Sequence, residues 1–211
     1  MILETDRFGN SAGQKLPGTM KQTGSTRVER LLEDDFVGFG MRVLISLIDA
    51  LILAVPSYLL DRWVPSWADS LQNELPLALP WILIVAYYVV CVPLFGGTPG
   101  RLILGTRIVN AEGKYPGVLQ ALLRHGFYII NSTLALLLIM VEYDYTVLSE
   151  FARSWQGPIA VTNFLMGGVV LADVLAILFT VRKRALHDLV AGTYVVYKAG
   201  LEYAEAVEDR R

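Results

Sequence analysis

The sequence has little of what enzymes and disulfide-stabilised proteins need. Its 211 residues include one cysteine and two histidines, which excludes an internal disulfide and disfavours a zinc site built from protein ligands alone. Charged residues make up only 18% of the chain and apolar residues 54%, so the chain as a whole is not disordered. Because acids and bases are segregated along the chain, the net charge of -2 gives no reason to expect a nucleic-acid partner.

The motifs of common enzyme classes are also missing. Gly100 and Gly105 have the spacing of a phosphate-binding loop, but Thr106 and Arg107 follow where Lys and Ser or Thr are required. His187-Asp188 is similar to the metal-binding pair of phosphohydrolases, yet the other ligands of such a site are absent. A nucleophile elbow and a CxxC pair are absent too. We therefore expect no enzyme activity, no cofactor and no bound metal.

Long apolar runs are the main feature that is present, and the mean hydropathy is +0.48. A bilayer crossing takes about 20 mostly apolar residues. Four runs meet this requirement, at residues 38–60, 77–95, 126–141 and 158–181. The third is the least apolar because it starts at a basic pair and contains Asn131. The sequence predicts an all-α membrane protein with a four-helix transmembrane bundle.

The distribution of Lys and Arg predicts the orientation. Residues 1–35 contain five, the loop after the second run four and the C-terminal segment six, whereas the other two loops have one each. Since cytoplasmic segments are enriched in these residues, both termini are expected in the cytoplasm. Residues 1–35 also lack the pattern of a signal peptide, and we interpret them as a mobile cytoplasmic arm, with residues 199–211 as an acidic cytoplasmic tail.

Polar residues interrupt the apolar runs. Asp49 is at the middle of the first run, where an aspartate costs roughly 2.5 to 3.5 kcal/mol on insertion scales. Arg42 and Ser46 share its helix face, because they precede it by seven and three residues. Asp173 gives the fourth run a similar polar face. Two interpretations stay open for these four residues: an ion, proton or ligand site, or structural hydrogen bonds with Arg42 extending to the interface.

Three local patterns together resemble the RDD family of bacterial membrane proteins, named for one arginine and two aspartates. They are Gly38-Phe39-Gly40-Met41-Arg42 leading to Asp49, then residues 97–109 from Gly-Thr-Pro-Gly-Arg to Arg-Ile-Val, and residues 182–196 around Leu-His-Asp188. The resemblance covers residues 36–198. It implies a multi-pass protein of the bacterial inner membrane, with a cytoplasmic-side amphipathic and extended segment between the second and third helices and another after the fourth. It also implies transport, with cation/proton antiport suggested for some members.

The topology and the resemblance together predict a contact. Arg42 and Asp188 both belong to the cytoplasmic interface. We therefore expect an ion pair that anchors residues 182–196, called the closing segment below, beneath the first helix. Asp49 is then left deeper without a neutralising arginine, free to exchange a proton for a cation.

Three functional hypotheses follow. The first is a small ion-coupled cation/proton transporter that works as a homo-oligomer. The second is a non-catalytic accessory or regulatory subunit that binds a partner membrane protein. The third is a lipid-interacting protein whose basic residues contact anionic headgroups. The basic residues concerned are Arg101, Arg107, Arg182, Lys183 and Arg184.

Overall fold

Four long helices dominate the structure, a computed structural model that describes residues 26–209. They are α1 (Phe39–Leu71), α2 (Ala78–Phe95), α4 (Val118–Met140) and α6 (Gln156–Leu175). Within residues 26–209, four helical segments are long and apolar enough to cross a membrane, and these helices form them. Many of their large apolar side chains point outward, as lipid contact requires. The predicted four-helix membrane protein is confirmed.

The helices differ from the predicted runs mainly at their ends. α1 continues to Leu71, past the predicted end at residue 60. Pro56 and Pro65 lie inside the helix and do not end it. It ends at Gln72, whose left-handed conformation caps the last carbonyls. α4 begins at Val118 rather than at residue 126. A short helix, α5 (Val147–Ser154), joins α4 to α6 and was not predicted.

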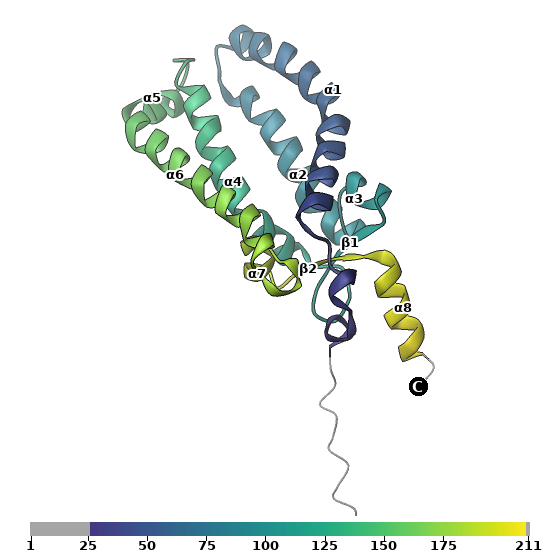
Figure 1. The fold of residues 1–211 in the computed structure, drawn as a ribbon. Coiled ribbons are helices and arrows are strands. Elements are labelled where there is room, and N and C mark those ends of the chain that lie inside the picture. The colour runs from purple at the N-terminus through teal and green to yellow at the C-terminus, as the bar shows by residue number, and fades with distance from the viewer. Residues whose placement is uncertain (1–25, 210–211) are drawn as a thin grey trace, which may run out of the picture.

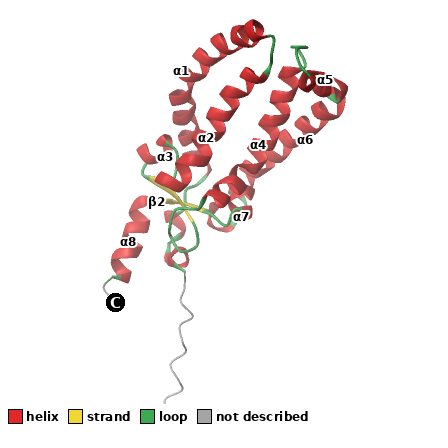
Figure 2. Ribbon diagram, turned by 180° about the vertical axis from the view of Figure 1, so that it is seen from behind, coloured by secondary structure: helices red, strands yellow, loops and turns green. Residues whose placement is uncertain are grey.

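The arrangement in space is two helix pairs that meet at one end of the molecule. Figure 1 shows α1 and α2 on one side and α4 and α6 on the other, and the reverse view in Figure 2 agrees. α4 packs against both α2 and α6, so it joins the two pairs. The end that holds the small sheet is called the sheet end below, and the end that holds α5 is called the far end.

The two segments predicted from the family resemblance come together at the sheet end. The first contains α3 (Pro99–Ile103) and β1 (Thr106–Val109), and the second contains α7 (Leu186–Val190) and β2 (Tyr194–Tyr197). β1 and β2 pair antiparallel, with Ile108 opposite Val195. The extended segments were expected, but their pairing was not. The pairing ties the α2–α4 connection to the segment that follows α6.

The chain ends pack onto this sheet. Two 3-10 helices, η1 (Arg27–Arg30) and η2 (Glu33–Asp35), precede α1, and α8 (Lys198–Glu208) follows β2. Val28, Phe36 and Leu201 form a buried cluster with sheet residues, and Arg27 forms an ion pair with Glu205 at 2.5 Å. Residues 26–35 of the expected arm, and the tail through residue 208, are therefore folded together. The rest of the arm, residues 1–25, lies outside the described residues.

Short 3-10 helices complete the connections. They are η3 (Leu75–Leu77), η4 (Ala176–Leu178) and η5 (Val181–Lys183). At the far end, the fully buried Glu74 accepts hydrogen bonds from the Thr146 hydroxyl and, at 2.9 Å, from the Ser149 backbone N–H. Although burial opposes ionisation, these hydrogen bonds keep the pKa of Glu74 below its ordinary value. This carboxylate fixes the start of α5 to the α1–α2 turn.

Candidate functional site

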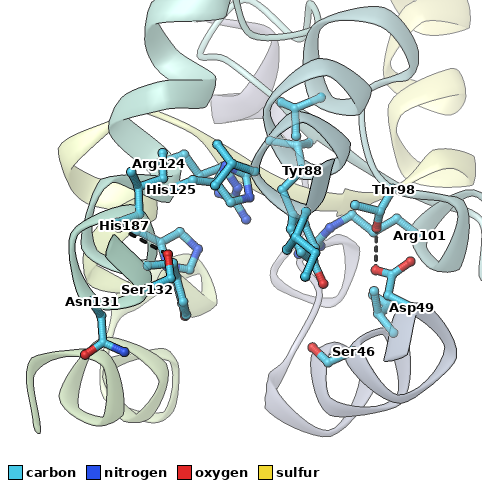
Figure 3. Close-up of a pocket in the computed structure, with 17 residues that line it drawn as sticks. Ser46, Asp49, Tyr88, Thr98, Arg101, Arg124, His125, Asn131, Ser132 and His187 are labelled. Atoms are coloured by element: carbon cyan, nitrogen blue, oxygen red, sulfur yellow. Dashed lines mark hydrogen bonds between the residues drawn. The ribbon is translucent and has the colours of Figure 1, made fainter. Parts of the chain in front are cut away.

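A cavity of about 370 Å³ with a mixed polar and apolar wall lies near the sheet end, among α1, α2 and α4. α1 contributes Ser46 and Asp49 to its wall, and α3 contributes Arg101. Arg124 and His125 of α4 lie across the cavity from Arg101, as Figure 3 shows. The structure thus places two of the expected α1 site residues on one internal cavity, together with basic side chains from other elements.

Asp49 is buried at this cavity and holds α1, α2 and α3 together. Its carboxylate accepts hydrogen bonds from the Tyr87 hydroxyl at 2.8 Å, the Thr98 hydroxyl at 2.5 Å and the Gly100 backbone N–H at 2.8 Å. Pro99 has no N–H, so Gly100 carries the first free N–H of α3, and Asp49 satisfies it. Asp49 forms no ion pair with a residue in the described range, as the sequence predicts, but neutral donors surround it.

The close approach at Gly100 depends on the absence of a side chain there. A Cβ atom at this position would lie 2.8 Å from Asp49 Oδ1 and 2.8 Å from the Ile45 carbonyl oxygen. Such distances are too short for real Cβ contacts. The Gly-Thr-Pro-Gly turn is therefore shaped to bring a backbone donor onto the α1 carboxylate.

Arg42 and Asp188 form the predicted contact, with Arg42 Nη1 at 2.7 Å from Asp188 Oδ2. Arg42 also donates to the Lys183 carbonyl at 2.7 Å and to the Val37 carbonyl at 3.1 Å. Arg124 donates to the other oxygen of the same Asp188 carboxylate. The sequence did not predict this second arginine. Two buried guanidinium groups thus share one carboxylate, which joins α1, α4 and α7.

Asp173 and His187 form a second buried pair. His187 Nδ1 lies 2.6 Å from Asp173 Oδ2, the His187 backbone N–H donates to Oδ1 at 2.7 Å, and the Tyr128 hydroxyl donates at 3.0 Å. Burial, with a contribution from the Arg124 charge, lowers the pKa of His187 below its ordinary value. The neutral ring then carries its proton on Nδ1 toward the carboxylate, and its unprotonated Nε2 lies 3.7 Å from Asp188 Oδ1.

Arg101 differs from Arg42 and Arg124 because it forms no ion pair with an acidic residue among residues 26–209. Its Nη1 is buried and has no hydrogen-bond partner among residues 26–209. In this same range its guanidinium forms no ion pair with Asp49, although the two residues line one cavity. Arg101 was expected to contact lipid headgroups, but its side chain lies in the cavity wall instead.

The other basic residues expected at lipid headgroups are engaged within the chain. Arg107 donates to the Thr106 carbonyl at 2.8 Å, and Lys183 donates to the Glu33 carbonyl at 3.2 Å. Arg182 and Arg184 lie over the Tyr194 ring. Arg184 also donates to the Asp188 carbonyl at 2.8 Å. These contacts use the basic groups to position the closing segment.

Ser46 and Asn131 have local structural partners. The Ser46 hydroxyl donates to the Arg42 carbonyl at 3.0 Å while it lines the cavity. Asn163 of α6 donates to the Asn131 carbonyl at 2.8 Å, so this pair links α4 to α6. Over the described range 26–209, no group of three or more metal-ligating His, Cys, Asp or Glu residues comes together.

Several residues at the site were missed from the sequence. Tyr87, Thr98 and Tyr128 are not among the expected site residues, yet each donates to an aspartate inside the bundle. The available signal was chemical. A buried carboxylate needs donors, and hydroxyl groups on neighbouring apolar helices are the nearest source of them.

Comparisons with known proteins agree with this arrangement. The model of the RDD family matches residues 36–192. The uncharacterized protein YckC of Bacillus subtilis (strain 168) is 29% identical over 177 residues, which cover 82% of this chain and 93% of that protein. The uncharacterized protein YxaI of the same strain is 26% identical over 182 residues, with 76% and 97% covered. No solved structure matches the chain.

Proposed function

Because the chain belongs to the RDD family, we propose that it is an ion-coupled transporter whose coupling carboxylate is Asp49. One observation carries the proposal: this carboxylate, only 2% exposed, lines a cavity between membrane-spanning helices. A charge at such a depth is costly to insert and is a functional candidate by default. The cavity gives an ion or a small solute space beside it.

The hydrogen bonds around Asp49 are compatible with a change of protonation. A hydroxyl both donates and accepts, so Thr98, at 2.5 Å from Asp49 Oδ2, can receive a hydrogen bond from the protonated acid after its O–H rotates. Tyr87 and Gly100 donate to the other oxygen and need not move. The site can therefore take up a proton without losing its three contacts.

The proposed orientation puts the sheet end in the cytoplasm of a bacterial cell, with the helices in the inner membrane. The sheet end carries Arg107, Lys183 and Lys198, whereas the connections at the far end contain Arg153. This asymmetry supports cytoplasmic termini under the positive-inside rule. Four helices leave little room for an ion pathway within a single chain, so the proposal includes a homo-oligomer. It assigns no enzyme activity to the cavity.

The test is cation-driven proton flux in proteoliposomes, measured for the wild type and for Asp49→Asn over a range of pH. Asn resembles the protonated acid in shape and hydrogen bonding, so the bundle should form while coupling is lost. Arg153→Gln, at the far end, is the matched control and should retain the flux. Absence of flux from well-folded wild type, or equal flux from Asp49→Asn, would overturn the transporter proposal.

A second candidate, an accessory subunit that binds a partner membrane protein, is favoured by a different observation. Asp49, Asp173 and Asp188 each accept hydrogen bonds from at least two elements, which is how polar residues hold helices together in membranes. The packed η1, η2 and α8 elements offer this role a folded surface at the sheet end. Failure of the flux test would direct the search to co-purifying membrane proteins.

A further inference from the structure

We propose that the cavity binds a small organic carboxylate, with Arg101 as the group that holds its charged end. The inference rests on the proposed transport function in one respect: it names the class of solute that would be transported. Its structural basis is a partly buried guanidinium, with its Nη1 buried and unpaired, that faces a cavity with a mixed polar and aliphatic wall. This basis is independent of the coupling role of Asp49.

The distribution of charges around the cavity leaves one cation without a partner. Arg42 and Arg124 share Asp188. Asp173 is taken by His187 and Tyr128, so it is not available to Arg101.

Asp49 forms no ion pair with Arg101 either. Its carboxylate accepts hydrogen bonds from Tyr87, Thr98 and Gly100, and it approaches no arginine of residues 26–209 within ion-pair distance. Leaving a partly buried charge without a counter-charge is unfavourable. An anion that enters the cavity would remove this cost, which is a thermodynamic reason for it to bind.

The guanidinium geometry selects the type of anion. Its planar fork of N–H donors matches the two oxygens of a carboxylate, and at Arg101 the buried Nη1 has no protein acceptor in the described part of the chain. His125 and Ser132 line the same cavity, but they donate to the Ala121 and Ile129 carbonyls, so Arg101 supplies the charged contact. An organic cation is disfavoured beside Arg101, because Arg101 and Arg124 both face this part of the cavity.

The rest of the wall indicates an organic body rather than a bare inorganic ion. Ile45, Val85, Val92 and Ile129 line the cavity together with the polar groups. A volume of about 370 Å³ is at the small end of the range for ligand pockets. A short aliphatic chain attached to the carboxylate would lie against these side chains and bury apolar area. Inorganic phosphate would leave that wall uncovered.

Binding is tested first, on the full chain purified in detergent at a fixed pH of about 7, where carboxylates are ionised. Butyrate, butylamine and inorganic phosphate are titrated calorimetrically against the wild type. We expect saturable binding of butyrate, none of butylamine, and phosphate binding at least about tenfold weaker than butyrate, a difference of about 1.4 kcal/mol.

The variants separate the role of Arg101 from a general effect of charge. Arg101→Gln should weaken butyrate binding by at least about tenfold. Arg101→Lys, which keeps the charge but loses the fork, should give an intermediate loss and remains informative if Arg101→Gln does not fold. Arg107→Gln is the matched control from the adjoining strand, since Arg107 does not line the cavity, and it should bind like the wild type.

Clear results would overturn the inference. Butyrate that does not bind, or that binds Arg101→Gln and Arg101→Lys as well as the wild type, excludes Arg101 as the anchor. Phosphate that binds as tightly as butyrate excludes the organic class.

Flux of labelled butyrate into proteoliposomes then distinguishes the two proposals. Butyrate binding that depends on Arg101, with neither butyrate flux nor cation-driven proton flux, supports the site and contradicts the transport function. Proton flux that depends on Asp49 without butyrate binding supports transport and contradicts the carboxylate site.

Discussion

Arg42 and Asp188 lie 2.7 Å apart although 146 positions separate them in the chain. The pair connects the first turn of α1 to α7, and Arg124 reaches the same carboxylate from α4. Because all three side chains are buried, the position of α7 depends on this triad. α7 in turn carries His187 to the cavity wall, so the triad also shapes the candidate site.

Asp188→Asn should destabilise the protein strongly. The substitution leaves two buried arginines without a counter-charge, and breaking a buried ion pair by removing one partner costs about 3 to 5 kcal/mol. The measurement is the free energy of unfolding in mixed detergent micelles. Asp144→Asn is the control, since its ion pair with Arg153 is largely exposed and should contribute less than about 1 kcal/mol. Equal losses in the two variants would contradict the structural role of the triad.

Gly100→Ala should displace α3 from α1. The new methyl group would meet Asp49 Oδ1 and the Ile45 carbonyl at 2.8 Å each, and overpacking of this kind costs about 1 to 3 kcal/mol. Thermal unfolding of the purified protein provides the measurement. Gly40→Ala is the matched control in α1, where nothing lies within 4 Å of an added Cβ. That control should be neutral or stabilising, because alanine favours helices. A stable Gly100→Ala protein would show that the contact with Asp49 is not required.

Tyr87→Phe removes one donor from the Asp49 carboxylate and keeps the aromatic packing. A hydrogen bond to a charged group contributes about 1.5 to 3 kcal/mol, so we expect a loss of that size in the free energy of unfolding. Tyr88→Phe, one position along α2, should lose less, because the Tyr88 hydroxyl does not donate to Asp49. The prediction fails if both variants lose the same amount.

The stability of the protein should fall as the pH decreases below neutrality. His187 stays neutral in the folded protein because burial lowers its pKa, whereas in the unfolded chain it takes up a proton near its ordinary pKa of about 6.5. The unfolded state then binds more protons, and the free energy of unfolding decreases with falling pH. Midpoints of thermal unfolding between about pH 7.5 and 5.5 would show this slope.

His187→Asn is the variant that assigns the slope. Its amide nitrogen can still donate to Asp173, but it does not titrate, so the pH dependence should be reduced relative to the wild type. An unchanged slope would mean that another group takes up the proton.

Much of the site was within reach of the sequence, and the rest shows where sequence reasoning fails. Asp49 was recognised because an acid in an apolar run stands out locally, and Arg42–Asp188 followed from placing both residues at one membrane interface. Arg124 lies before the predicted start of the third helix, which is eight residues later than the observed start of α4. Inside α4 it points to Asp188.

The sequence by itself determined the membrane class, the four spanning helices and the two segments that return to the sheet end. Length, hydropathy and charge distribution are properties of contiguous residues, and the bilayer acts on each run separately. Only the tertiary structure decided that Asp49 would be held by Tyr87, Thr98 and Gly100, and that Arg101 would stay unpaired beside the cavity. Those contacts join residues far apart in the chain, and helix packing, with the requirement that buried polar groups find partners, selects which of them meet.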